Sequence, residues 1–109
     1  MYKTGSVILI KMHPASGQEL KKFRPALVLQ FHPLRNFVTF IPLTSQTKTI
    51  SLNEAILAPS STNGLEKPSL ALCWYIQTVG TNRIQKKLGQ LNKIELNKVI
   101  TLVKKSLFL

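Results

Sequence analysis

The stretch KKFRPALVLQF, residues 21–31, is followed after a short turn by NFVTFIPLTSQ, residues 36–46. Both stretches are rich in β-branched and aromatic residues, and HPLR between them is a turn sequence, so we expect a central β-hairpin. Pro25 opens the first strand, where a missing backbone donor is tolerated. Pro42 predicts an edge or a bulge near the end of the second strand.

This hairpin predicts a cluster of polar groups at one of its ends. Arg24 lies at the mouth of the first strand, and Thr44 and Ser45 lie at the end of its partner. The whole chain carries a formal net charge of +11. A guanidinium beside two hydroxyls in so basic a chain is suited to holding a phosphodiester and to breaking it.

Further strands are expected on both sides of the hairpin. GSVILIKM, residues 5–12, is rich in β-branched residues, and TISLNEAIL, residues 49–57, alternates imperfectly. SLALCWYIQTV, residues 69–79, is almost continuously apolar, which predicts a strand buried on both faces and ended by Gly80. Between them, residues 58–68 collect Pro, Ser, Asn and Gly and predict a surface loop.

The C-terminal segment predicts a helix that begins after Asn92. Glu95 follows three residues later and completes a capping box. A helical turn at residues 82–85 and a brief strand at 87–91 are expected before it. The apolar residues of the helix recur at helical spacing: Leu96, Val99, Ile100, Val103 and Leu107.

A chain of 109 residues, 44% of them hydrophobic, is long enough for one core and too short for two ordinary domains. We therefore expect residues 1–109 to form a single domain. Several strands and one or two short helices predict a mostly antiparallel α+β architecture, folded as a small barrel.

The chemistry open to the chain is limited by its few acidic groups. Fifteen Lys and Arg face four Glu, and Asp does not occur. Clusters of metal ligands are not expected from four scattered Glu, Cys73, His13 and His32, so we predict no metal and no cofactor. A paired-carboxylate hydrolase is disfavoured, and a Ser-His-Asp triad lacks its acid.

The basic excess favours an anionic partner, either nucleic acid or an acidic protein, over a charge that only keeps the chain in solution. Cys73 cannot form an internal disulfide and lies in an apolar run, which predicts a buried, inert thiol. No apolar run approaches the length of a membrane span. We expect a cytoplasmic protein with no membrane partner.

Six pieces of the sequence together resemble the MazF and PemK (Kid) family of bacterial toxins, in that family's order and spacing. They are GSVILI, SGQELKKFRPALVL, IPLTSQ, NGLEKPS, ALCWYIQTV and KKLGQLNKIELNKV. The ordered set, which covers nearly the whole chain, carries the resemblance. It implies an SH3-like barrel with a C-terminal helix, the fold of MazF, PemK and CcdB toxins.

The resemblance also implies an activity. Members are typically homodimeric, metal-independent endoribonucleases, known as mRNA interferases, that cleave single-stranded messenger RNA and are neutralised by an acidic antitoxin protein. In the family's typical reaction the ribose 2′-hydroxyl attacks the adjacent phosphorus and leaves a cyclic phosphate and a 5′-hydroxyl.

The resemblance assigns roles to the polar cluster of the hairpin. Arg24 occupies the position of the family's catalytic arginine in its RP motif, Thr44 matches the active-site threonine, and Ser45 matches the hydroxyl that often follows. Arg24 can donate two hydrogen bonds to phosphate oxygens, whereas its high intrinsic pKa makes it a poor general base. A solvated arginine at a strand end and a threonine that caps a turn are the structural alternatives.

The chain departs from the family at the residues that move protons. Where many members read DQIRT, this chain reads WYIQT, with Trp74 and Tyr75 in the first two places and Gln77 where Arg is common. A histidine that some members carry before the RP motif is matched by Gln18, and the loop residue His13 is a possible substitute. Adjacent strand residues face opposite sides, so one of the two aromatics is expected in the core and the other, Tyr75, against an RNA base.

Basic residues complete the expected RNA path, namely Lys21, Lys22, Lys86 and Lys87. The residues predicted to bind RNA are Ser45, Lys22, Lys21, Tyr75, Gln77 and Gln18.

Three functions remain open from the sequence. The first is a ribonuclease toxin that depends on Arg24 and Thr44. The second is a weakened member that binds RNA or its antitoxin without cutting, because Trp74 and Gln77 replace an acid and an arginine. The third is an inhibitor of DNA gyrase, because a related toxin family shares the barrel, although fold does not fix function.

Overall fold

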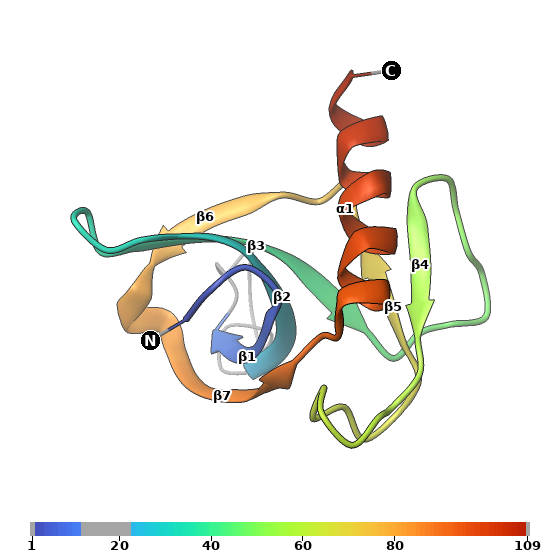
Figure 1. Ribbon diagram of the computed structural model, residues 1–109, viewed down its shortest axis with the longest axis horizontal. Helices are drawn as coiled ribbons and strands as arrows, with labels where there is room; N and C mark the ends of the chain where they lie inside the picture. Colours follow the sequence, from blue (N-terminus) through green and yellow to red (C-terminus); the bar gives the residue numbers. More distant parts are fainter. Residues whose placement is uncertain (1, 12–22, 109) are drawn as a thin grey trace, which may run out of the picture.

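The computed structural model describes residues 2–11 and 23–108. These residues form seven strands, a short 3-10 helix and one α-helix (Figure 1). In chain order the elements are β1 Ser6–Lys11, β2 Phe23–His32, β3 Phe37–Thr44, β4 Glu54–Leu57, β5 Ser69–Leu72, β6 Gln77–Gly80, η2 Thr81–Arg83, β7 Ile84–Gln90 and α1 Lys93–Phe108.

The strands pair in the order β4-β5-β3-β2-β1-β7, with β6 also paired to β3, and every pairing is antiparallel. The expected α+β class with a C-terminal helix is confirmed. The sheet curls on itself (Figure 1), but in the described part of the chain β4 and β7 do not pair with each other. The strands therefore form an open, curled sheet and do not close into the expected barrel.

The central hairpin is present as β2 and β3, joined by a turn at residues 33–36. Asn36 takes a positive φ of 58° there, which asparagine tolerates better than most residues. β3 is an interior strand and not an edge strand, and Pro42 pairs with Ala26 of β2, but on the other side of β3 it falls in a gap between pairings, as a residue without an N–H requires. Pro42 falls where β3 changes partner from β6 to β5, and the irregular register lies in β2 between Val28 and Gln30.

The apolar run at residues 69–79 is two strands and not the single one expected. β3 advances three residues between its last pairing with β6 and its first with β5, whereas the opposite segment advances six, from Ala71 to Gln77. The three extra residues have no place in the ladder. They leave the sheet in a turn at Cys73 and Trp74, which the Tyr75 N–H closes on the Leu72 carbonyl at 3.0 Å.

Two further strand predictions needed correction at their boundaries. The segment 49–57 pairs only over β4, because Ile50 and Leu52 remain exposed and have no apolar face to cover. The expected turn at 82–85 is η2, and the brief strand at 87–91 is the longer β7, which pairs with β1. The loop predicted at 58–68 is confirmed.

Buried side chains form two clusters that share the strands β1, β2 and β3. One cluster includes Val7, Leu27 and Ile41 and packs against Val99 and Val103 of α1. The other includes Ile8, Val28 and Phe40 on the opposite faces of the same strands. Because successive strand residues point to opposite faces, these three strands are apolar on both sides and anchor the sheet.

The capping box predicted for the C-terminal helix is confirmed. The Glu95 N–H donates to Asn92 Oδ1 at 2.8 Å, and the Asn92 N–H donates to Glu95 Oε1 at 3.0 Å. Val99 and Val103 are buried, but Leu107 is 57% exposed, so the apolar stripe is shorter than expected. Figure 1 shows the reason, because the last turn of α1 extends past the sheet. No helix within residues 2–11 and 23–108 is long and apolar enough to cross a membrane.

We expect Asn92→Ala to lower the free energy of unfolding by about 1 kcal/mol, because it removes a cap that satisfies an otherwise unpaired amide. Asn97→Ala is the matched control, since it makes the same change at an exposed position inside α1, where alanine is the better helix former. Urea unfolding of both variants measures the difference. Equal stabilities would show that the capping box contributes nothing.

Candidate active site

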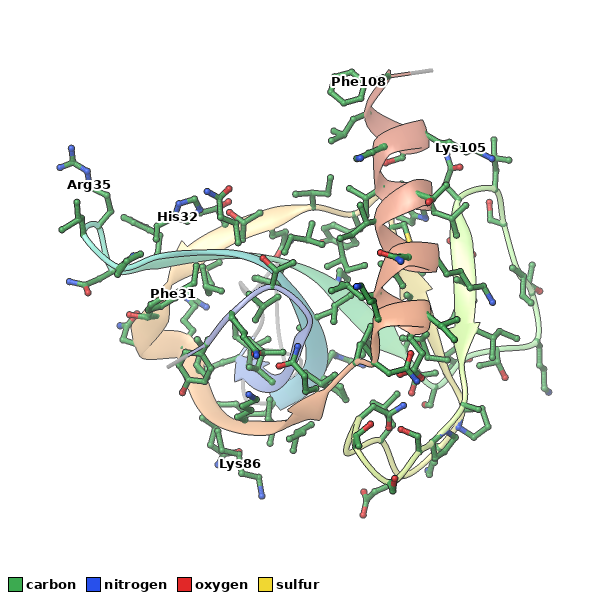
Figure 2. All side chains as sticks on the ribbon, in the orientation of Figure 1. Phe31, His32, Arg35, Lys86, Lys105 and Phe108 are labelled. Atoms are coloured by element: carbon green, nitrogen blue, oxygen red, sulfur yellow. The ribbon has the colours of Figure 1, made fainter. Side chains whose placement is uncertain are left out.

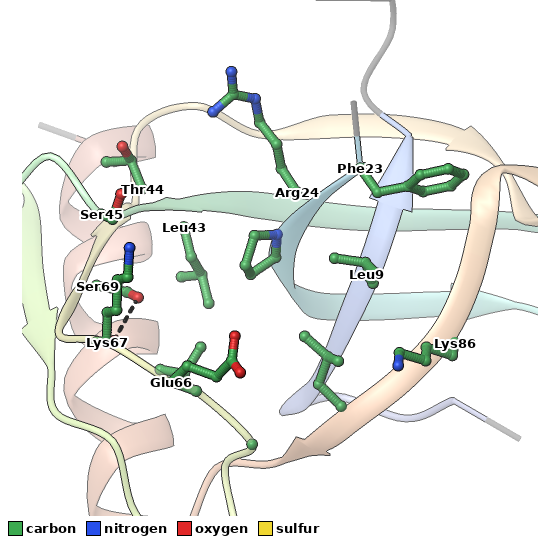
Figure 3. A pocket seen from close by; sticks show the side chains of 14 residues that line it. Leu9, Phe23, Arg24, Leu43, Thr44, Ser45, Glu66, Lys67, Ser69 and Lys86 are labelled. Carbon is green, nitrogen blue, oxygen red and sulfur yellow. Dashed lines mark hydrogen bonds between the residues drawn. The ribbon is translucent and has the colours of Figure 1, made fainter. Parts of the chain in front are cut away.

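A cleft of about 500 Å³ lies where β2, β3, β7 and the loop before β5 meet (Figure 3). Its polar and charged lining comprises Arg24, Thr44, Ser45, Glu66, Lys67, Ser69 and Lys86. Its apolar floor and wall comprise Leu9, Phe23, Pro25, Leu43, Leu65 and Leu88. The three residues that the hairpin predicted to come together therefore do line one cavity.

Arg24 reaches the cleft from the start of β2, where it pairs with Ile10 of β1. The residue is exposed, and within the described residues its guanidinium makes no hydrogen bond or ion pair. Figure 3 shows the guanidinium on the same side of the cleft as the Thr44 hydroxyl. Nothing among the described residues therefore occupies its donors, which can bind an anion that enters the cleft.

Thr44 ends β3 and is half-buried. Its Oγ1 accepts a hydrogen bond from the Gln46 N–H at 3.1 Å, which is the turn-capping role considered as an alternative. A hydroxyl that accepts one bond still has its own hydrogen to donate, so the cap and a phosphate contact are compatible. Ser45 follows in the turn and is exposed on the cleft.

The loop before β5 contributes a part of the cleft that sequence reasoning missed. Glu66 and Lys67 are exposed, and Ser69 donates from Oγ to the Lys67 carbonyl at 3.0 Å (Figure 3). Lys86 comes from β7 on the opposite wall. Cations thus outnumber the single carboxylate in the lining by three to one, which gives the cleft a positive potential.

A buried asparagine holds that loop in shape. Asn63 has no exposed surface; its Oδ1 accepts the N–H groups of Ser60 and Leu65, and its Nδ2 donates to the Ala58 carbonyl and to Glu95. Gly64 follows at a φ of +72°, and a Cβ there would stand 2.1 Å from the Leu88 carbonyl oxygen. The Asn-Gly pair was the sequence signal that this loop is fixed, because both positions suit special backbone geometry.

The structure contradicts the expectation that either Trp74 or Tyr75 fills the core. Both are exposed on the turn between β5 and β6, at 51% and 38%, and their rings stack with centroids 5.3 Å apart. The indole N–H donates to Glu54 Oε2 at 2.6 Å, which fixes the pair against β4. The alternation rule failed because these residues lie in the extra turn and not in a strand.

Other residues predicted to bind RNA lie away from the cleft or outside the described chain. Tyr75 and Gln77 are not among the lining residues. Gln77 of β6 pairs with Phe40 of β3, and its side-chain oxygen Oε1 is buried without a hydrogen-bond partner in the described part of the chain. Lys87 does not line the cleft either. The candidates outside the described residues are Gln18, Lys21, Lys22 and the possible proton carrier His13.

Cys73 is fully buried, as the sequence predicted. Burial, reinforced by the negative charge of Glu54, raises the pKa of its thiol to about 11. The reactive thiolate is therefore scarce at neutral pH, and Cys73 is not a nucleophile. Among the described residues, no three His, Cys, Asp or Glu side chains gather as metal ligands would.

Comparison with known proteins identifies what this arrangement is similar to. The family model of PemK-like and MazF-like toxins of type II toxin–antitoxin systems matches residues 3–107. The endoribonuclease MazF9 of Mycobacterium tuberculosis is 25% identical over 104 residues, which cover 88% of this chain and 87% of that protein.

Solved structures share the fold. MazF from Deinococcus radiodurans superposes with a TM-score of 0.78 at 20% identity, over 99% of this chain and 97% of that one. A mycobacterial endoribonuclease in complex with its cognate antitoxin gives 0.76 at 20% identity, over 100% and 97%. The MazF-like fold expected from the sequence is thus confirmed.

Proposed function

Because this chain belongs to the family of PemK-like and MazF-like toxins of type II toxin–antitoxin systems, we propose that it is a metal-independent endoribonuclease that cleaves single-stranded messenger RNA. The observation that carries the proposal is the cleft in which Arg24, Thr44 and Ser45 come together. The similarity to MazF9, an endoribonuclease, supports the same reaction.

The nucleophile of the proposed reaction is the 2′-hydroxyl of the RNA itself, so the protein has to supply hydrogen-bond donors for the transition state and no metal-bound water. As that oxygen attacks the adjacent phosphorus, negative charge builds up on the two nonbridging oxygens. Arg24 donates two parallel hydrogen bonds to them, and Thr44 and Ser45 each donate one. The products are a 2′,3′-cyclic phosphate and a 5′-hydroxyl.

Neighbouring phosphates of the RNA are held by the cationic walls of the cleft, where Lys67 and Lys86 stand on two of its sides. Lys21, Lys22 and Gln18 stay predicted RNA-binding residues and lie outside the described part of the chain. Each phosphate that a lysine or arginine neutralises releases condensed counterions, so binding is expected to weaken steeply as salt rises.

We assign base stacking to the exposed Trp74–Tyr75 pair, because a fixed aromatic surface accepts any unpaired base. Tyr75→Ala is expected to weaken the binding of single-stranded RNA by about 1 to 3 kcal/mol, the loss typical of one stacking partner. Phe108→Ala, at a 79% exposed aromatic on the end of α1, is the matched control and should bind as wild type does. Fluorescence anisotropy with labelled RNA measures both, and equal affinities would remove the pair from the RNA path.

We also propose an antitoxin and a second copy of the chain as the protein's partners, and the cytoplasm as its location. A segment of an acidic antitoxin protein is expected to occupy the positive cleft and so neutralise the toxin, and the chain is expected to act as a homodimer. The solved antitoxin complex of a mycobacterial endoribonuclease with the same fold supports an antitoxin as partner. We place the protein in the cytoplasm and its activity in one toxin domain over residues 1–109.

The test is cleavage of a pool of unstructured RNAs of varied sequence in EDTA, with the product ends identified by mass spectrometry. Fragments that end in a cyclic phosphate and begin with a 5′-hydroxyl are the expected result. Tight, salt-sensitive RNA binding without any product would instead identify a noncutting member. A separate assay of DNA supercoiling by gyrase tests the third function, and inhibition there would identify a gyrase inhibitor.

A further inference from the structure

We propose that Glu66 is the catalytic base that takes the proton from the attacking 2′-hydroxyl, an inference that rests on the proposed ribonuclease activity. Glu66 supplies the single carboxylate among the described residues that line the cleft. Figure 3 shows this carboxylate directed into the middle of the cavity, across from Arg24 and Thr44.

The remaining lining groups of the cleft cannot do this work. The guanidinium of Arg24 and the ammonium groups of Lys67 and Lys86 are hydrogen-bond donors with no lone pair to offer. The hydroxyls of Thr44 and Ser45 are weak bases and are suited to donating. No histidine from the described residues lines the cavity. His32 lies at the far end of β2, where its Nε2 shares a hydrogen bond with the Thr39 hydroxyl. By elimination within this lining, the proton acceptor is Glu66.

The other two described glutamates are already engaged. Glu54 accepts hydrogen bonds from the Trp74 indole and from the Ser51 N–H. Glu95 accepts from the Asn92 N–H and from Asn63 Nδ2. Glu66, in contrast, makes no hydrogen bond or ion pair within residues 2–11 and 23–108, so no described group occupies its lone pairs.

The backbone under Glu66 is fixed in advance, as a catalytic group requires. Leu65 is buried in the core beside it, and the Leu65 N–H is bound by Asn63. Gly64 packs directly on the Leu88 carbonyl of β7. A carboxylate in a cleft for phosphates opposes binding by charge repulsion, so its presence beside the three cations of the lining supports a role in the chemical step.

The step balances without a further reactant. A Glu66 oxygen accepts the 2′-hydroxyl proton while the bond from O2′ to phosphorus forms and the bond from phosphorus to O5′ breaks. Solvent water protonates the leaving O5′, and Glu66 returns its proton to solvent after the products leave. The cations that line the cleft with Glu66 are Arg24 from β2, which stabilises the phosphorane, and Lys67 and Lys86, which hold the neighbouring phosphates.

The first test compares Glu66→Gln with wild type under single-turnover conditions, with protein in excess over an RNA whose cleavage site has been mapped with the wild type. We expect cleavage to slow by about 100-fold or more. RNA affinity should stay equal or increase, because a negative charge has been removed from the cleft. Lys98→Gln is the control, since it removes one charge from an exposed position on α1 that does not line the cleft, and it should cleave as wild type does.

A second substrate separates proton removal from other roles of the carboxylate. When the bridging 5′-oxygen is replaced by sulfur, the leaving group departs without a proton. The Glu66→Gln defect should persist on this substrate if Glu66 is the base. Recovery to the wild-type rate would show that Glu66 protonates the leaving group, and would overturn the proposal.

Glu19→Gln is measured in parallel, because Glu19 is the remaining carboxylate of the chain and lies outside the described residues. A large loss in this variant with near wild-type cleavage by Glu66→Gln would transfer the role to Glu19 and overturn the proposal. If wild type cuts no RNA at all, the proposed ribonuclease function itself fails. If wild type and Glu66→Gln cut RNA at the same rate, the ribonuclease function stands and the role of Glu66 is overturned.

Discussion

Replacing Arg24 by alanine is expected to lower the rate of RNA cleavage by about 1,000-fold, a loss of about 4 kcal/mol in transition-state stabilisation. The magnitude follows from the geometry of the cleft, because Arg24 is the residue able to give the phosphorane two parallel charged hydrogen bonds. Ground-state binding should fall much less, since Lys67 and Lys86 still face the phosphates. Single-turnover kinetics and a separate binding measurement distinguish these two effects.

Two further variants make the Arg24 prediction specific. Arg24→Lys retains the charge but loses the planar pair of donors, so it should recover only about tenfold of the loss. Arg35→Ala removes the same charge from the tip of the β2–β3 hairpin, which Figure 2 shows at the far end of the sheet. We expect it to cleave normally. If Arg24→Ala cuts as fast as Arg35→Ala, the cleft is not the active site.

Replacing Gly64 by alanine is expected to lower the free energy of unfolding by about 3 kcal/mol or more. The added Cβ would stand 2.1 Å from the Leu88 carbonyl oxygen and 2.5 Å from its carbon, and the φ of +72° is strained for any residue with a side chain. Backbone atoms on both sides of the contact cannot rotate away, so the loop must separate from β7. Thermal and urea unfolding both measure the loss.

Gly80→Ala provides the matched control for Gly64→Ala. Its added Cβ would meet Asn82 Oδ1 at 2.7 Å, but that atom ends a side chain that can turn aside, and the backbone at Gly80 is extended. We expect a cost below about 1 kcal/mol. Any Gly64→Ala protein that remains folded should also cleave slowly, because Glu66 and Lys67 move with the loop. Equal stability of the two variants would show that Gly64 is not required.

The hairpin and the helix could be predicted because each is specified by neighbours in sequence. A β-branched run on either side of a turn defines β2 and β3, and the capping box of Asn92 and Glu95 defines the start of α1. Arg24 and Thr44 were found in the same way, since strands of one hairpin bring their far ends together. These features depend on residues that are close in the chain.

The aromatic turn could not be predicted, because its cause lies in another strand. Residues 69–79 form an apolar run that suits one buried strand, and only the spacing of pairings along β3 shows that three residues are in excess. Trp74 and Tyr75 are exposed for that reason, although large aromatic side chains in an apolar run ordinarily indicate a core. A similar argument applies to the open sheet, whose closure depends on whether β4 and β7 meet.

The amino-acid order alone determined a basic chain with few carboxylates, a central hairpin, a capped terminal helix and the pairing of a guanidinium with hydroxyls at one strand end. Only the tertiary structure decided that Glu66, about forty residues from Arg24 in the chain, faces the same cavity. The physical reason is that Asn63 and Gly64 fold their loop against β7 and α1 through contacts between distant segments, which no local pattern encodes.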